Sequence, residues 1–324
     1  MPEPLWIYLM ALLYFTKLTT CSAIAGAFDS VSHDRLTRML QGTWSGHILL
    51  NLALRALFTV AGGYLIVDDT VIEKPYAQLL GEAAWVWSSK QHKVMFGVSV
   101  VLLIWTEGQT RIPLAFRLWQ QGGPSKFDLA LELLRYARTR LRCQPQFVLF
   151  DSWYSSKKLL KRIRDYGWYF VCQPKKNRRF EGVPLSQYLL QPYWPAMGWL
   201  PGDIKELVVR YRRKYYATNR LSLSAKEVRT VYRKRQEVEE VIRVLKSQLS
   251  LDACQTGYRR PGTEQPHPRP RAPEHHIALC LVASLIVERE CLDRGLTWRQ
   301  RKRYLILNGV QVALPALERV RSAA

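Results

Sequence analysis

The chain has 324 residues, of which 48% are hydrophobic, and its formal net charge is +22 at pH 7. A chain of this length and apolar content can bury a sizeable core, which excludes an intrinsically disordered tail. The excess of 48 Lys and Arg over 26 Asp and Glu residues favours a polyanionic partner, which we expect to be a nucleic acid. Charge alone indicates no particular chemistry.

The six cysteines are dispersed, with no Cys-x-x-Cys pair and no His at zinc spacing. They are typical of reduced thiols, so we expect a cytoplasmic protein. The apolar runs Leu5 to Phe15 and Ile277 to Val287 are shorter than a membrane span, and the first follows Glu3 rather than a basic residue. We therefore interpret both as buried helices and expect no membrane partner.

Residues 1–60 have helical patterns interrupted by polar segments. Ser32 is a plausible N-cap for a short helix over Asp34 to Leu40. A pair of short helices here could be a DNA-binding helix-turn-helix, and an ordinary helical hairpin fits equally well. We predict a helical N-terminal region with a possible role in DNA binding.

From Tyr64 the hydrophobic pattern becomes that of strands. Tyr64 to Val67 is a β-favouring run that we expect to end on Asp68-Asp69-Thr70. Further strands are predicted over Lys93–Trp105, Arg111–Trp119, Phe147–Phe150 and Trp168–Cys172, and helices over Ser125–Leu141 and Ser155–Tyr166. The first three strands follow one another as hairpins and the later ones alternate with helices. This order indicates an α/β fold with a mixed sheet flanked by helices.

Changes of composition divide the chain into segments. We predict a helical region at 1–60, a catalytic core formed by 61–173 and 225–258, an insertion at 174–224, a proline-rich loop at 259–274, and a helical C-terminal region at 275–324. The insertion contains a basic hairpin pattern at Ile204 to Tyr216. The second part of the core is predicted to begin with one continuous helix, from Ala225 to Leu249.

Polar side chains follow one side of this predicted helix, beside an apolar face that we expect to be buried. At about 100° per residue, four of them fall within roughly 60° of one another, namely Tyr232, Arg235, Glu239 and Lys246. Glu237 and Glu240 project well away from this stripe, whereas Arg243 is expected on its side. Glu239 is therefore the carboxylate aimed at the aromatic and basic groups.

Three acids are candidates for phosphodiester chemistry: Asp68 or Asp69 at the first strand, Asp151 after the fourth, and Glu239. Carboxylate oxygens are preferred ligands of Mg²⁺, and two such ions about 3.5–4 Å apart can stabilise the attacking and leaving oxygens together. Each acid also has an ordinary structural interpretation. The first Asp could be a turn residue, Asp151 a helix cap, and Glu239 a solvated charge.

The spacing Tyr232-(2)-Arg235-(3)-Glu239-(6)-Lys246 matches the signature of a large group of bacterial insertion-sequence transposases of the DDE type. Val67 to Thr70 resembles the first acidic motif of this group, and Leu149 to Tyr154 resembles the second. The resemblance spans residues 64–250. It implies a ribonuclease H-like catalytic fold with a β-rich insertion, in a bacterial protein associated with the nucleoid.

The resemblance also implies roles for individual residues. Asp68, Asp151 and Glu239 would be the catalytic triad and would bind two Mg²⁺ ions, for which Mn²⁺ can substitute. Tyr232, Arg235 and Lys246 would contact phosphates of the transposon end. Asp68 and Asp69 both fit an acid near Thr70, and the Asp-x-Thr spacing favours Asp68.

We therefore expect a transposase that cuts the ends of its element and joins the freed 3′-hydroxyl to target DNA. The implied partners are double-stranded DNA, as terminal inverted repeats and as target, and at least one further copy of the chain in the DNA complex. A domesticated or decayed derivative that keeps only DNA binding is one alternative, although all three acids are present. A ribonuclease H-like nuclease without strand transfer is another.

Overall fold

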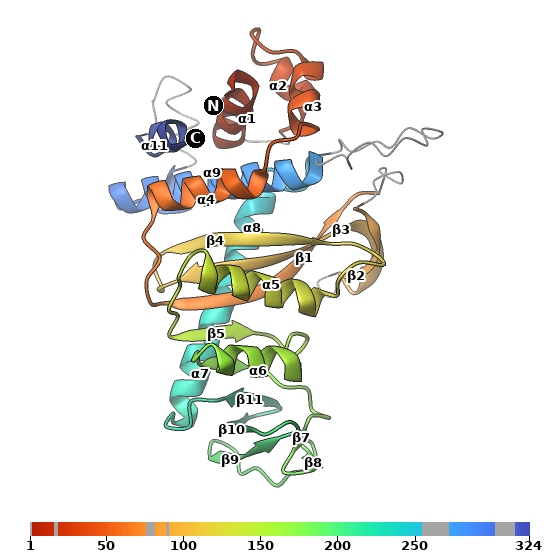
Figure 1. Cartoon of the computed structure of the whole chain (residues 1–324), viewed down its shortest axis with the longest axis vertical. Coiled ribbons are helices and arrows are strands. Elements are labelled where there is room, and N and C mark those ends of the chain that lie inside the picture. Colours follow the sequence, from red (N-terminus) through yellow and green to blue (C-terminus); the bar gives the residue numbers. More distant parts are fainter. Residues whose placement is uncertain (1, 16–18, 76–81, 89–90, 255–271, 302–314) are drawn as a thin grey trace.

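The computed structural model of the protein describes residues 2–15, 19–75, 82–88, 91–254, 272–301 and 315–324. Its elements are stacked along the long axis (Figure 1). N-terminal and C-terminal helices lie together at one end, the sheet core is in the middle, and the insertion lies at the other end. The predicted helical, core and insertion segments therefore follow one another in space.

The N-terminal helices are α1 (Glu3–Tyr14), α2 (Cys21–Ala25), α3 (His33–Leu40) and α4 (Gly46–Leu57). The hydroxyl of Ser32 accepts the N–H of Arg35 at 3.3 Å, so Ser32 caps α3 as predicted. Most of α1 is buried, which confirms the interpretation of its apolar run. These helices pack with α9 into one helical layer.

Among the described residues, nine strands form one mixed sheet in the order β2-β3-β1-β5-β6-β11-β10-β9, with β4 also paired to β3. They are β1 (Tyr64–Glu73), β2 (Ala84–Ser88), β3 (Lys93–Thr106), β4 (Arg111–Trp119), β5 (Phe147–Phe150), β6 (Phe170–Cys172), β9 (Pro195–Leu200), β10 (Ile204–Tyr211) and β11 (Lys214–Thr218). The pairs β1–β5 and β5–β6 are parallel and the others antiparallel. The short strands β7 (Arg179–Phe180) and β8 (Val183–Pro184) pair separately. The predicted mixed α/β sheet is confirmed.

The first strand does not end on Asp68-Asp69-Thr70, as the sequence suggested, but continues to Glu73. Its whole length pairs with β3, whereas its parallel partner β5 pairs only with Tyr64 to Ile66. Asp68 and Asp69 interrupt the apolar pattern of the sequence, but the backbone hydrogen bonds of the strand continue past them. The apolar pattern therefore placed the end of the strand too early. Asp68 and Asp69 are consecutive residues inside a strand, so their side chains point to opposite faces of the sheet.

Two strands of the main sheet, β2 and β9, were missing from the prediction, as were the short strands β7 and β8. β2 lies between β1 and β3 in sequence, so the first three predicted strands are not consecutive hairpins, and β9 precedes the predicted basic hairpin of β10 and β11. The strands of the insertion also continue the core sheet, because β11 pairs with β6 through Ala217 and Cys172. The insertion is thus joined to the core by backbone hydrogen bonds.

Helices cover both faces of the sheet. α5 (Lys126–Thr139) and α6 (Lys157–Asp165) lie on one face, and α7 (Ala225–Arg233) and α8 (Glu237–Gln248) run across the other (Figure 1). The predicted single helix is therefore wrong, because a 3₁₀ turn at Lys234–Gln236 separates α7 from α8. Side chains on both sides of this turn contact the sheet, and such tertiary contacts override the helical periodicity of the sequence.

The C-terminal region contains α9 (Ala272–Arg294) and α11 (Pro315–Ala323). α9 begins three residues before the predicted start, at the end of the proline-rich segment, whose residues 259–271 lie outside the described ranges. Of the helix predicted over Gly295 to Ile306, the described part is helical from Trp298 to Arg301. No helix within the described ranges is long and apolar enough to cross a membrane.

Glu206, on β10, is completely buried, and neither of its carboxylate oxygens has a hydrogen-bond partner among the described residues. Burial raises the pKa of Glu206 from 4.5 to about 8, against the opposing positive charge of Arg178. The folded protein therefore keeps a proton that the unfolded chain releases above pH 4.5. The stability that this proton contributes is fully present below that pH and is lost as the pH rises through about 8.

We expect the free energy of unfolding of the wild type to fall relative to that of Glu206→Gln as the pH rises between these two values. The slope is at most about 1.4 kcal/mol per pH unit, because one proton is involved. Urea denaturation of both proteins over this range measures the difference. Parallel pH profiles for the two proteins would contradict the assignment of a neutral buried carboxyl.

Candidate active site

Two acids meet at one edge of the parallel part of the sheet. The pairing of β1 with β5 aligns Ile66 with Leu149, and continuing the same register by two residues aligns Asp68 with Asp151. Burial raises the pKa of Asp68 to about 7; the guanidinium of Arg235 opposes this rise, and the carboxylates of Asp151 and Asp69 add to it. The sheet therefore brings Asp68 and Asp151 close enough for their charges to interact.

Asp151 lies immediately after β5, in the loop that leads to α6. One of its carboxylate oxygens accepts the backbone N–H groups of Trp153 at 2.9 Å and Tyr154 at 3.3 Å. The alternative of a helix cap is wrong, because Ser156 caps α6 by accepting the N–H of Leu159. The turn fixes one oxygen of Asp151, and the other accepts no hydrogen bond within the described part of the chain.

Asp69 points to the opposite face of the sheet, toward α5. Its carboxylate oxygens are 2.6 Å from the ammonium of Lys126 and 2.9 Å from the hydroxyl of the buried Tyr154. Both oxygens of Asp69 are thus engaged in contacts that join β1 to α5 and to the loop after β5. This arrangement favours Asp68 over Asp69 as the acid available for chemistry.

Arg235, in the 3₁₀ turn, lies between two of the predicted catalytic acids. Its guanidinium donates to Asp68 at 2.9 Å and lies 3.6 Å from the carboxylate of Glu239. The side chain of Glu239 is 66% exposed, compared with 14% for Asp68. Glu239 therefore faces the same site as Asp68, but the guanidinium separates the two carboxylates. No group of three or more His, Cys, Asp or Glu side chains within the described residues could hold a metal ion in this arrangement.

Tyr232 and Lys246 extend the site in opposite directions along the sheet. The hydroxyl of Tyr232 donates to the side-chain oxygen of Gln173 at 3.3 Å, next to β6. The ammonium of Lys246 donates to the backbone oxygen of Val71 at 2.6 Å, in the second half of β1. Despite the break in the helix, Tyr232, Arg235 and Lys246 contact β1 or the residue after β6, and Glu239 reaches the site through Arg235. Their contacts with DNA phosphates remain a prediction.

Residues 62–260 match the family model of the transposase DDE domain. The chain belongs to this family. Its fold resembles that of a piggyBac transposase solved as a synaptic complex with hairpin DNA, with a TM-score of 0.56 and 11% identity, over 98% of this chain and 74% of that one. At this identity the likeness shows the ribonuclease H-like fold alone. No curated protein matches the chain.

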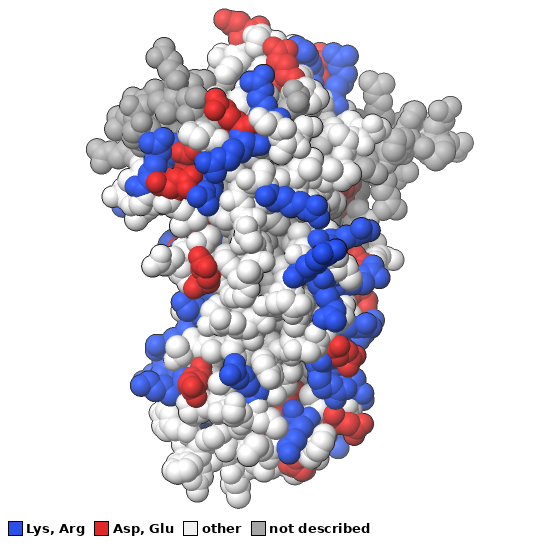
Figure 2. Space-filling model, turned by 60° about the vertical axis from the view of Figure 1, so that its left-hand side comes forward, with Lys and Arg blue, Asp and Glu red and all other residues white. Residues whose placement is uncertain are grey.

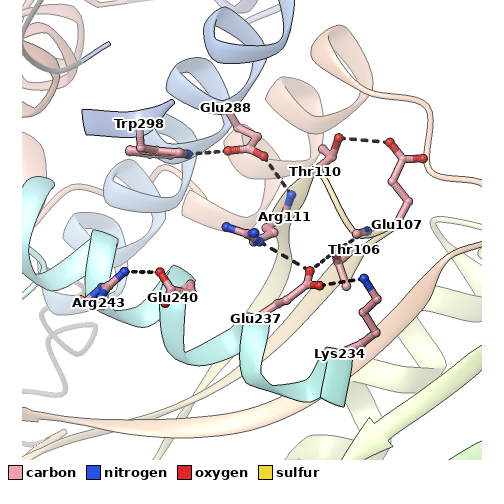
Figure 3. A network of polar contacts seen from close by, with 11 residues as sticks. Thr106, Glu107, Thr110, Arg111, Lys234, Glu237, Glu240, Arg243, Glu288 and Trp298 are labelled. Carbon is pink, nitrogen blue, oxygen red and sulfur yellow. Dashed lines mark hydrogen bonds and ion pairs between the residues drawn. The ribbon is translucent and has the colours of Figure 1, made fainter. Parts of the chain in front are cut away.

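In the DDE domain, α8 is also fixed from its other side, by contacts that the sequence pattern did not reveal (Figure 3). Glu237 accepts the hydroxyl of Thr106, and its carboxylate lies 3.5 Å from the guanidinium of Arg111 and 3.4 Å from the ammonium of Lys234. The backbone N–H of Arg111 donates in turn to Glu288 of α9 at 2.9 Å. The first turn of α8 is thus connected to the β3–β4 hairpin and, through it, to α9.

Arg243 does not share the side of α8 that faces Asp68, contrary to the expectation from a regular helix. Its guanidinium pairs with Glu240, and both side chains lie on the side of α8 that Figure 3 shows together with Arg111. The ion pair with Glu240, three residues earlier in the same regular helix, turns the Arg243 side chain to that side.

The surface of the DDE domain carries the charge that the composition indicated. Lys and Arg side chains gather along one side of the molecular face drawn in Figure 2, with fewer Asp and Glu side chains between them. A surface of this sign attracts a polyanion over several ångströms and makes binding dependent on salt.

Proposed function

We propose that the chain is a DNA transposase that cuts the ends of its element and joins the freed 3′-hydroxyl to target DNA. The observation that carries the proposal is the proximity of Asp68, on β1, to Asp151, directly after the parallel neighbour β5, with Arg235 and Glu239 of the segment Tyr232–Lys246 facing them. Membership in the transposase DDE family supports the same chemistry.

The donor set suits a hard divalent cation. Asp68 and Asp151 supply carboxylate oxygens at one sheet edge, and Glu239 approaches from α8, so these three residues would hold Mg²⁺. When bound, two such ions supply an activated water and neutralise the leaving oxygen at phosphorus. Manganese, which accepts the same ligands, would substitute.

Arg235 compensates the negative charge of Asp68 in the protein alone, through the 2.9 Å hydrogen bond. Its planar guanidinium can also bind a phosphate group in bidentate fashion, so we infer that it turns toward DNA when a strand reaches the acids. Tyr232 and Lys246, on either side, would then contact neighbouring phosphates. Burial raises the pKa of Tyr232, so its hydroxyl remains a hydrogen-bond donor.

Two successive displacements complete the proposed reaction. Water attacks phosphorus at the element's end and releases a 3′-hydroxyl; this hydroxyl then attacks a phosphorus of the target strand and releases a new 3′-hydroxyl there. Joining both ends requires at least two protomers, and the piggyBac neighbour was solved as a synaptic complex with DNA. We therefore propose terminal repeats, target DNA and a second copy of the chain as partners.

Replacing Asp151 with Asn tests the proposal. We expect Asp151→Asn to reduce Mg²⁺-dependent cleavage of duplexes that carry the element's terminal repeat, by on the order of 10³-fold, because a charged ligand becomes neutral. Binding of the same duplex should persist. Asp165→Asn, at the exposed end of α6, is the matched control and should leave cleavage unchanged. Undiminished cleavage by Asp151→Asn would overturn the proposal.

A second assay separates the transposase from a nuclease of the same fold. A duplex with a precut 3′ end is incubated with the wild type, Mg²⁺ and a circular plasmid. Covalent joining of the labelled end to the plasmid is the result expected of a transposase. Cleavage without joining would identify a nuclease, and binding without cleavage would identify a derivative that keeps only DNA binding.

A further inference from the structure

A pocket of about 460 Å³ lies beside the second acidic motif. Its walls are the loop that follows Asp151, the start of α6, and the segment between β6 and β7. The lining includes four basic residues and no acidic one; the basic residues are Lys157, Lys175, Arg178 and Arg179. A concave surface with this charge is suited to an anion.

The basic side chains of this pocket form no ion pair within the described residues, although the charge of Arg178 also acts on the buried Glu206. Arg235 and Lys126, at the neighbouring acids, do form such pairs. One terminal nitrogen of Arg178 is buried and has no hydrogen-bond partner among the described residues. A buried donor without a partner is unfavourable, so a ligand that offers an acceptor to Arg178 would be bound more tightly. The oxygens of a phosphate group are such acceptors.

The walls of the pocket are held in place by packing. Gly202, at φ +99°, makes room for the side chain of Lys157, because a Cβ at this position would lie 1.9 Å from the Cε of Lys157. The ring of Trp153 stacks on Phe127 at 6.0 Å between centroids, and the ammonium of Lys175 lies 5.2 Å from the centroid of Trp153. Lys157 and Lys175 are therefore positioned before a ligand arrives.

The pocket is also directly connected to the candidate active site. Ser152 and Trp153 line it, and the N–H of Trp153 donates to the carboxylate of Asp151 at 2.9 Å. Asp151 and the pocket are thus joined by one short loop, which places the pocket next to the acid.

We propose that this pocket binds a backbone phosphate of the DNA strand that passes over Asp151, and that it fixes which phosphate reaches the acids. The inference rests on the proposed function, because it takes DNA as the substrate. It adds a phosphate site formed by Lys157, Arg178 and Arg179, outside the signature residues of the helical segment.

Charge removal gives the first measurement. We expect Lys157→Gln combined with Arg178→Gln to weaken binding of a terminal-repeat duplex about tenfold near physiological salt, and to reduce the slope of log K against log[salt] by about 1. Arg213→Gln combined with Lys214→Gln, in the exposed β10–β11 turn, removes the same charge outside the pocket. Lys157→Gln with Arg179→Gln serves as a second pocket variant if Arg178, which has one buried terminal nitrogen, is required for folding.

Neutral linkages in the DNA give the decisive measurement. Duplexes are prepared in which one phosphate at a time is replaced by an uncharged methylphosphonate, and the affinity of each is measured for the wild type, the pocket variants and the β10–β11 control. We expect one linkage next to the cut site to weaken binding by the wild type and the control, and to have no effect on binding by the pocket variants. If every linkage affects all proteins equally, the proposal is wrong.

Two further outcomes would also overturn it. The wild type could fail to bind the duplex, or inorganic phosphate could bind the wild type and not the pocket variants while no single linkage matters, which would identify a site for free anions. The binding measurements need no cleavage. A protein that shows the expected linkage pattern but does not cut DNA would therefore contradict the proposed function and leave the phosphate site standing.

Discussion

Asp68→Asn is expected to reduce Mg²⁺-dependent DNA cleavage by on the order of 10³-fold, whereas Asp69→Asn should retain it within about tenfold. The two residues are adjacent, yet the strand directs them to opposite faces. Asp68 contacts Arg235 beside Asp151, and Asp69 contacts Lys126 and Tyr154. Each substitution changes one charge and almost no volume, so each variant is the control for the other.

The free energy of unfolding should respond in the opposite order, because Asp69→Asn should lower it more than Asp68→Asn. Asp69→Asn weakens a largely buried ion pair and a hydrogen bond to a buried tyrosine, which we expect to lower the free energy of unfolding by about 1–3 kcal/mol. Asp68→Asn weakens the equally buried pair with Arg235 but also removes a charge that burial disfavours, so its loss of stability should be smaller. Chemical denaturation and a cleavage assay on the same preparations measure both effects. If Asp69→Asn abolished cleavage while Asp68→Asn retained it, Asp69 would be the catalytic acid.

The sequence predicted structure best where an uninterrupted apolar run is followed directly by a charged residue. The strand over Phe147–Phe150 and the acid that follows it were predicted correctly, because a short apolar run that ends in Asp leaves few interpretations. The position of Asp68 was less accessible. A strand that contains two consecutive acids interrupts the apolar pattern, and the pairing that extends it to Glu73 comes from β3, about thirty residues away in sequence.

The segment from Tyr232 to Lys246 was predicted less well than the strand over Phe147–Phe150. Its residues were identified by spacing, but their arrangement was inferred from a regular helix, and the 3₁₀ turn changed that arrangement. No local signal, such as Gly or Pro, marks the turn at Lys234–Gln236. The turn coincides with contacts to distant strands, through Arg235 on one side and Glu237 on the other. Contacts of this kind cannot be read from local sequence, which is also why the role of Glu237 was not foreseen.

Glu237→Ala is expected to lower the free energy of unfolding by about 3 kcal/mol. The substitution removes the acceptor of the Thr106 hydroxyl and the partner of Arg111 and Lys234, while the side chain that it replaces is only 13% exposed. Glu240→Ala is the matched control. It removes an acid three residues later in the same helix, whose partner Arg243 is exposed, and should cost less than about 1 kcal/mol. Urea denaturation of both variants gives the comparison.

The rate of DNA cleavage should also depend on the contacts of Glu237, because Glu237 lies between Arg235 and Glu239, which face Asp68. Arg235 precedes it by two positions and Glu239 follows it by two, so a loosened first turn of α8 would misplace both. We expect Glu237→Ala to reduce cleavage at saturating DNA about tenfold or more below the melting temperature, with little change in DNA affinity. Glu237→Gln can still accept the Thr106 hydroxyl and should recover part of the activity. If Glu237→Ala lowered stability without changing the cleavage rate of the folded protein, the contact would support the fold alone, and the orientation of Arg235 and Glu239 would have to be set by the sheet.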